Sequence, residues 1–256
     1  EEQPAKEYRE AFRAFSGALR AGDFQKLVLS RGCTDAFPHG FSWARAFTAA
    51  CRRYVHSYVY LFHTPQTGFW LGATPEVLLA GGKGEYRTVA LAGTQFLQEG
   101  KLTTPWSEKN IREQAFVTEY IGGCLRERGV RFTLEGPYTA TAGELAHLKT
   151  DIRLRLSSVE ALGDILQALH PTPAVCGLPK EEAFRFILSH EGYDRSYYAG
   201  FLGRWEPEGK TAEKIRLYAG GGILPASVCE EEWMETERKL QTMKYVISKG
   251  GTDVFG

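Results

Sequence analysis

The 256-residue sequence lacks the features that mark several classes of protein. Its 31 basic residues balance 31 acidic ones, so no net positive field indicates a nucleic-acid or anionic-membrane partner. No apolar run approaches the roughly 20 residues that a membrane-spanning helix needs. The polar N-terminus, EEQPAKEYRE, is not a signal peptide. By elimination, we expect a cytoplasmic protein with no nucleic-acid and no membrane partner.

The cysteines and the short motifs exclude further classes of site. The five cysteines are odd in number, stand far apart and form no CxxC pair, so free thiols in a reducing compartment are expected. The sequence has no GxxxxGK[ST] loop and no GxGxxG between a strand and a helix, which argues against nucleotide binding. It also has no GxSxG elbow and no HExxH pair.

What is present fits an ordinary globular protein. Hydrophobic residues make up 43% and charged residues 24% of the chain. Tyr8, Phe12, Phe15 and Leu19 form an apolar helical stripe that ends before Gly22. Further strands are expected at 27–30, from 58, 68, 75 and 88 onward, and at 214–219. Further helices are expected at 43–54, 108–128, 159–169, 181–190 and 230–248. Strands grouped early and helices grouped later predict one α+β, or layered α/β, domain over residues 1–256.

Lys26 is the first candidate for chemistry. It stands at the start of an apolar strand, in FQKLVLSRG. One interpretation is a strand-edge lysine whose ammonium group lies in water. The other is a partly buried lysine that loses its proton near neutral pH and acts as a base.

A carboxylate set near the C-terminus is the second candidate. Glu232 and Glu235 are three residues apart and Lys239 is four beyond, so the three share one helical face in EEEWMETERK. They form either a solvated face with one ion pair or a pair of hard oxygen ligands for Mg²⁺ beside a substrate-binding cation. Glu113, on the long middle helix, could supply another ligand.

Glycines and histidines add weaker signals. The glycines of YAGGGI, at 218–223, permit close approach of main-chain N–H groups to an anion, although such clusters also mark turns. His170, in LHPTP, has a backbone restricted by two nearby prolines. His147, in AHLKT, is expected to be structural.

Nine segments then match one family in order and context, from end to end of the chain. The resemblance is to the chorismate-binding enzymes, which include isochorismate, salicylate, anthranilate and aminodeoxychorismate synthases. The segments are FQKLVLSR, GATPEVLL, TVALAGT, the spacing of Lys109 and Glu113, ELAHLKT, ALHPTPAVCGLP, YDRSYYAGFLG, RLYAGGGI and EEWMETERK. The resemblance implies a large, mostly antiparallel sheet flanked by helices, with chorismate as the substrate. A monomer is expected, since no heptad pattern calls for self-association.

The resemblance implies roles for individual residues. Lys26 would be the general base that activates water, and Glu76 the general acid that protonates the leaving hydroxyl. Mg²⁺ would be held by Glu113, Glu235 and Glu232. The substrate-binding residues would be Thr94, His170, Gly220, Gly222 and Lys239.

Subgroup features favour isochorismate synthase, with menaquinone and siderophore pathways both open. Lys26 is typical of water-using members, and Ala92 stands where aminodeoxychorismate synthases have a covalent lysine. A salicylate synthase would use the same acid and base and remains the alternative. An anthranilate-type enzyme would not be expected to have Lys26, and a non-catalytic chorismate sensor would have little need of an acid–base pair.

Two departures from the family stand out. Relatives usually carry an N-terminal portion that completes the sheet, and this sequence begins near the start of the shared core. Between Gly203 and Ile215 relatives have a longer hairpin, whose extra strand carries an arginine expected to bind a substrate carboxylate. Arg204 is not at the matching position. A true deletion and omitted residues are both open at this point.

Overall fold

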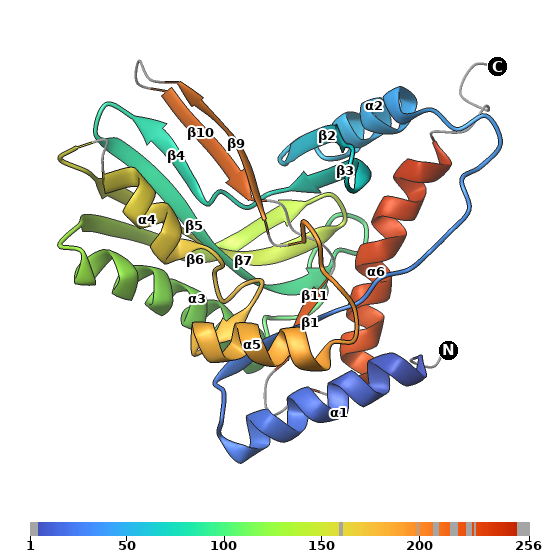
Figure 1. The fold of residues 1–256 in the computed structure, drawn as a ribbon, viewed down its shortest axis with the longest axis horizontal. Helices are drawn as coiled ribbons and strands as arrows, with labels where there is room; N and C mark the ends of the chain where they lie inside the picture. The colour runs from blue at the N-terminus through green and yellow to red at the C-terminus, as the bar shows by residue number, and fades with distance from the viewer. Residues whose placement is uncertain are drawn as a thin grey trace.

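A computed structural model describes residues 5–158, 161–198, 200–206, 210–215, 220–223, 227 and 229–249 (Figure 1). Within these ranges the chain forms helices and three antiparallel sheets. The helices are α1 (Lys6–Ala21), α2 (Trp43–Arg53), α3 (Glu108–Glu127), α4 (Ala161–Leu169), α5 (Lys180–His190) and α6 (Cys229–Ser248). The strands are β1 (Lys26–Ser30), β2 (Tyr58–Thr64), β3 (Gly68–Thr74), β4 (Leu79–Gly82), β5 (Glu85–Phe96), β6 (Arg131–Ala142), β7 (Leu145–Arg155), β8 (Gly177–Leu178), β9 (Phe201–Glu206), β10 (Lys210–Ile215) and β11 (Gly220–Ile223).

The largest sheet has the strand order β6-β7-β5-β4-β10-β9, and α3 and α4 cover one of its faces (Figure 1). Helix α3 begins at Ser107, whose hydroxyl accepts a hydrogen bond from the N–H of Asn110 at 3.2 Å. Val117, Ile121 and Leu125 recur every four residues and bury one side of this helix against the sheet. The first turns of α3 are thereby held at one end of the sheet.

A smaller sheet, in the order β11-β1-β8, has β1 at its centre. Every residue of β1 is buried, because α1, α5 and α6 pack around it. The apolar stripe of α1 contributes Phe15 to this second core, and α1 ends at Gly22, whose φ of +85° suits glycine. A strand buried on both faces therefore carries Lys26 at its first position.

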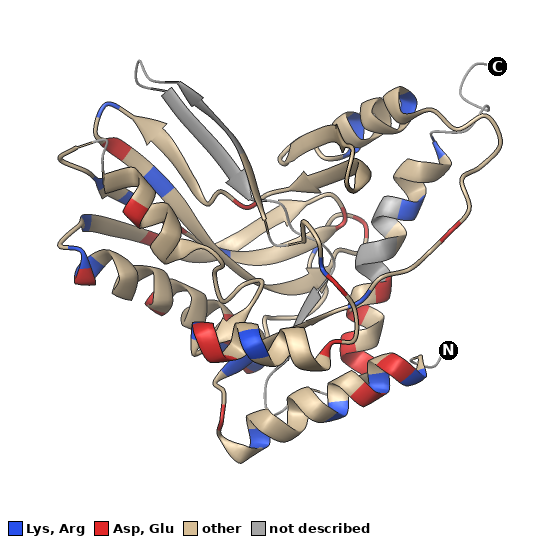
Figure 2. Cartoon of the chain, in the orientation of Figure 1, with Lys and Arg blue, Asp and Glu red and all other residues tan. Residues whose placement is uncertain are grey.

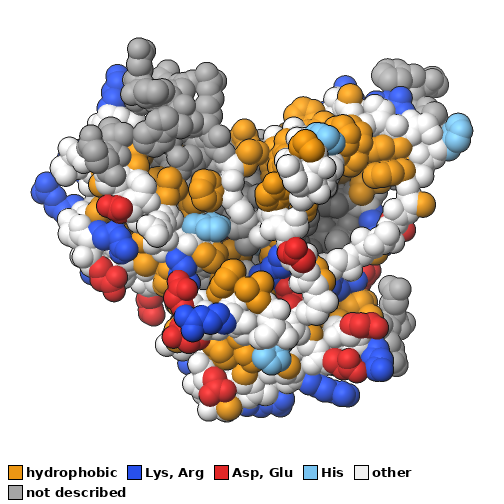
Figure 3. Space-filling view, viewed as in Figure 1, with side chains coloured by type: hydrophobic (Ala, Val, Ile, Leu, Met, Phe, Trp, Pro, Cys, Tyr) orange, Lys and Arg blue, Asp and Glu red, His pale blue; other side chains and the backbone are white. Residues whose placement is uncertain are grey.

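The third sheet is the β2–β3 hairpin, which packs with α2 and α6 around Ala50, Tyr54 and Val246. Apolar side chains gather on the surface over this hairpin and α2, among them the half-exposed ring of Phe69 (Figure 3). None of the helices in the described ranges combines the length and the hydropathy that crossing a bilayer requires.

The predicted class, helices flanking a large antiparallel sheet, is confirmed, and so are the described helices. The predicted grouping of strands before helices is wrong, since β6 and β7 follow α3. The strand expected from Pro75 begins only at Leu79, so Glu76 lies in a connection. The residues 216–219 of the last predicted strand lie outside the described part of the chain.

Gly177→Ala should destabilise the fold, because strand β8 approaches β1 too closely for a side chain. A Cβ atom at position 177 would lie 2.5 Å from the carbonyl oxygen of Lys26 and 2.7 Å from Cβ of Ala183. We expect a loss of about 1–3 kcal/mol in the free energy of unfolding, measured with urea. The control is Gly123→Ala in α3, where a Cβ meets nothing within 4 Å, and which should gain about 0.5–1 kcal/mol. Equal effects of the two substitutions would contradict this close approach.

Candidate active site

Lys26 is fully buried at the start of β1, between β8 and β11. Its Nζ lies 3.2 Å from Oε1 of Glu113, on the first turns of α3. This ion pair compensates the charge of Lys26, because Nζ makes no hydrogen bond of acceptable geometry with any described residue. The interpretation of Lys26 as a strand-edge lysine in water is therefore wrong, because the residue is buried; its role as a base stays a prediction.

Glu76 lies in the connection between β3 and β4, and its side chain faces inward. The residue is only 1% exposed. Its backbone N–H donates to Oγ1 of Thr74 at 3.1 Å, which fixes the connection. Burial raises the pKa of Glu76 to about 8, although the charge of Lys26 and the hydroxyl of Thr172 oppose the shift. A carboxyl group in this environment holds its proton at neutral pH, as a general acid requires.

Three carboxylates meet near one ammonium group at the junction of α3 and α6. Nζ of Lys109 donates to Oε1 of Glu232 at 2.6 Å. Burial lowers the pKa of Lys109, but the nearby charges of Glu232, Glu235 and Glu113 together raise it above the ordinary value. Acidic residues gather on the first turns of α6, where Glu232 is buried (Figure 2). Of the two alternatives for this face, the solvated one is thus wrong for Glu232.

The carboxylates suit a hard cation by the chemistry of their donor atoms. Burial raises the pKa of Glu232 to about 7, Lys109 opposes this shift, and Glu235 adds to it. Among the described residues Oε2 of Glu232 is buried with no hydrogen bond of acceptable geometry, although the side chain of Ser227 lies near enough to oppose the rise in the pKa of this carboxyl group. In the described residues no three such side chains are gathered as tightly as a bound metal needs. The positive charges beside them are those of Lys109, which pairs with Glu232, and Lys26, which pairs with Glu113.

The predicted substrate-binding residues divide between two places. Thr94, on β5, lies opposite His147 on β7, and its Oγ1 is 3.3 Å from Nδ1 of that histidine. Nδ1 of His147 is also 3.2 Å from the carbonyl oxygen of Gly93. His147, expected to be structural, thus bridges the backbone of β5 and a predicted site residue.

Gly220 and Gly222 pair with Ser30 and Val28, so β11 runs beside the strand of Lys26. The ring of His170 packs edge-on against Phe201, with 5.4 Å between the centroids. His170 also precedes Thr172, the neighbour of Glu76, by two residues. The predicted residues thus come from several elements, and their contact with the substrate stays a prediction.

Three other neighbours of the site were missed or left without a role. Lys109 was noted only for its spacing from Glu113, and Thr172 only as part of a matching segment. Tyr198 is buried, and Glu76 is among the charges that raise its pKa, after the larger effect of burial. Their positions depend on contacts between distant segments, which the local sequence does not display. The side chain of Lys239 lies outside the described residues.

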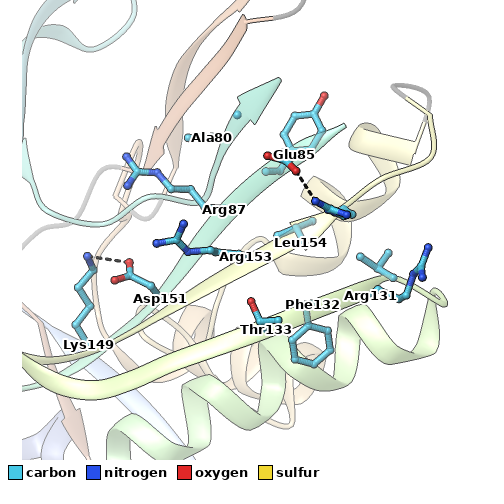
Figure 4. A pocket seen from close by; sticks show the side chains of 14 residues that line it. Ala80, Glu85, Arg87, Arg131, Phe132, Thr133, Lys149, Asp151, Arg153 and Leu154 are labelled. Carbon is cyan, nitrogen blue, oxygen red and sulfur yellow. Dashed lines mark hydrogen bonds and ion pairs between the residues drawn. The ribbon is translucent and has the colours of Figure 1, made fainter. Parts of the chain in front are cut away.

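A cavity of about 1350 Å³ among the described residues lies elsewhere. It opens on the face of the large sheet that α3 does not cover, and it contains none of the predicted site residues (Figure 4). Arg87 and Arg153 extend into it, while Lys149 pairs with Asp151 at 2.9 Å (Figure 4).

Comparison with known proteins places these residues in a family context. A family model described as "Chorismate binding enzyme" matches residues 1–248. The chain is 31% identical over 239 residues to isochorismate synthase MenF of Haemophilus influenzae, covering 86% of this chain and 56% of that protein. It is 34% identical over 269 residues to the salicylate biosynthesis isochorismate synthase of Pseudomonas aeruginosa, covering 92% and 54%.

A solved structure of MenF, the menaquinone-specific isochorismate synthase from Escherichia coli, has the same fold. Its TM-score is 0.81 at 27% identity, covering 95% of this chain and 61% of that one. The chain spans a little over half the length of the curated relatives named above.

Glu76→Gln should stabilise the fold at alkaline pH. The pKa of Glu76 in the folded chain, about 8, lies above its ordinary value of 4.5, so the unfolded chain loses this proton first. The contribution of Glu76 to stability therefore falls as pH rises from about 4.5 to about 8. Glutamine does not ionise, so the variant should exceed the wild type in unfolding free energy by more at pH 9 than at pH 5. Urea denaturation at the two pH values measures this, and an equal difference at both would contradict it.

Proposed function

The chain belongs to the family of chorismate-binding enzymes, and we propose that it is an isochorismate synthase. The observation that carries the proposal is that Lys26 and Glu76 are both buried and lie near each other, with the pKa of Glu76 raised by burial. The names of the relatives, which are isochorismate synthases, agree with it. The chain spans little more than half of those proteins, so their activity comes to this chain as a proposal.

In the proposed reaction, Lys26 in its neutral form accepts a proton from a water molecule that attacks C2 of the chorismate ring. Glu76 donates its proton to the hydroxyl group at C4, which leaves as water while the ring double bonds shift. One water enters and one leaves, so the reaction is an isomerisation. The raised pKa of Glu76 keeps it protonated for this step.

We propose Glu113, Glu232 and Glu235 as the residues that hold Mg²⁺. When bound, this ion would neutralise and orient a ring carboxylate of the substrate. Glu113 is also the ion-pair partner of Lys26, so the proposed base and the metal site share one carboxylate. Thr94, His170, Lys239 and the main-chain N–H groups of Gly220 and Gly222 are proposed to contact the substrate.

The deciding experiment is incubation of the protein with chorismate and Mg²⁺ in H₂¹⁸O, with and without ammonium. Isochorismate carrying one ¹⁸O atom at C2 is expected, identified by chromatography and mass. Salicylate with pyruvate would instead indicate a salicylate synthase. An aminated product formed only with ammonium would contradict the role of Lys26, and binding of chorismate without turnover would indicate a sensor.

Lys26→Ala and Glu76→Gln should each reduce kcat by at least about 10²–10⁴-fold, since each removes one proton-transfer group. The matched control is Lys101→Ala. Lys101 is exposed and distant in sequence from both Lys26 and Glu76, so this variant should keep wild-type kcat. Circular dichroism and thermal unfolding verify that each variant is folded. A folded Lys26→Ala variant with near-normal kcat would remove the lysine from the mechanism.

Glu235→Gln should weaken the binding of Mg²⁺ by at least about tenfold, because it replaces a charged oxygen ligand with a neutral amide. Activity of the wild type should disappear with EDTA and return with added Mg²⁺. The matched control is Glu231→Gln, an exposed carboxylate on the same turns of α6. Titration calorimetry measures the affinity directly, and equal affinities in the two variants would contradict the assignment of Glu235.

A further inference from the structure

Two separate groups of contacts, or anchor points, hold the end of β1. Ser30, its last residue, binds a carboxylate at the end of α5, while Arg31, the next residue, binds helix α6. Lys26 lies at the other end of the same five-residue strand. Each anchor point contains one arginine with polar contacts, and the two arginines contact segments that adjoin different parts of the candidate site.

The first anchor point is built around Arg195. Its Nη2 donates to the carbonyl oxygen of Val28 at 2.8 Å, and its Nη1 donates to that of Val175 at 3.0 Å. Val28 belongs to the strand of Lys26, and Val175 follows Thr172, the neighbour of Glu76, by three residues. One planar guanidinium group therefore joins the backbone segments on which the proposed base and the surroundings of the proposed acid are built.

A buried carboxylate fixes the orientation of that guanidinium group. Glu191 pairs with both Nε and Nη2 of Arg195 and is also an acceptor for the N–H and hydroxyl groups of Ser30, at 2.6 and 2.8 Å. The guanidinium carbon lies 4.9 Å from the ring centre of Tyr198, which is close to Glu76. Lysine could keep the charge at position 195 but could not reach both carbonyl oxygens with a rigid fork.

The second anchor point is built around Arg31. Its Nε donates to Oγ1 of Thr236 at 2.8 Å, and its Nη2 pairs with Glu237. Its guanidinium carbon lies 3.7 Å from the ring centre of Trp233. Trp233 and Thr236 directly follow Glu232 and Glu235, the proposed metal ligands, so Arg31 contacts the helix turn that carries them.

We infer that two arginines divide the alignment of this site: Arg195 positions the acid and the base, and Arg31 positions the metal-binding carboxylates. Neither arginine touches the reacting groups, so both are positioning residues. The inference rests on the proposed function. A misplacement of about 1 Å can reduce the rate of an enzymatic reaction about 10²-fold, so loss of either arginine should be measurable.

The test compares Arg195→Lys with Arg31→Lys in two independent measurements. We expect Arg195→Lys to lower kcat by about 10- to 100-fold, with little change in KM and an unchanged Kd for Mn²⁺, used as a spectroscopic probe in place of Mg²⁺. We expect Arg31→Lys to raise the Kd for Mn²⁺ by about tenfold, more than it lowers kcat at saturating metal. Electron paramagnetic resonance of free Mn²⁺ gives the Kd without substrate or turnover.

Two further variants separate positioning from general loss of structure. Glu191→Gln should reproduce the kinetic defect of Arg195→Lys, because it removes the charge that orients the guanidinium group. Arg153→Gln, on the open face of the large sheet, should match the wild type in both measurements (Figure 4). If Arg195→Lys and Arg31→Lys shift kcat and the Kd for Mn²⁺ to the same extent, or if neither shifts, the division of roles is overturned.

Failure of the proposed function would be recognised separately. A wild-type protein that binds Mn²⁺ but does not convert chorismate would disprove the proposed activity. Hydrogen exchange would then test the anchor points without substrate. Arg195→Lys should speed exchange in β1 and residues 172–178, and Arg31→Lys should speed it in the first turns of α6. Exchange that rises equally in both regions in each variant would still refute the division.

Discussion

The complete burial of one lysine is the constraint on which the rest of the site depends. A lysine at the centre of a three-stranded sheet, packed on both faces, is unfavourable unless an opposite charge lies near it. Glu113 provides that charge at 3.2 Å, which requires the first turns of α3 to lie against β1. The large sheet must then hold α3 in place, so the position of Lys26 links the two cores of the molecule.

Charge balance in this interior follows from the same constraint. Glu76, Glu113 and Glu232 are buried, and the ammonium groups near them are those of Lys26 and Lys109. The carboxyl group without an ion pair of its own, Glu76, has its pKa raised most by burial, to about 8. Glutamate side chains thus provide both an acid that keeps its proton and carboxylates suited to a cation, because their surroundings differ.

Local patterns predicted much of the fold and named several site residues. The stripe from Tyr8 to Leu19 and the glycine after it predicted α1 closely, because helix periodicity and capping are properties of neighbouring residues. The hairpin of β6 and β7 was missed: β6 carries mostly exposed side chains with no clear apolar alternation. Its existence depends on pairing with β5, through β7, more than 50 residues away in places. Thr94 was predicted for the site, but its partner His147 was not.

The sequence by itself determined which chemical groups are available and which helices carry them. It identified Lys26, Glu76 and the carboxylates of α3 and α6 as candidates, and it excluded nucleotide-binding loops. Tertiary structure alone decided that Lys26 is buried, that burial raises the pKa of Glu76, that Thr172 and Tyr198 lie near Glu76, and that Lys109 lies among the carboxylates of α3 and α6. The physical reason is that periodicity and capping act over a few residues. Burial, pKa and ion pairing depend on which distant segments pack together.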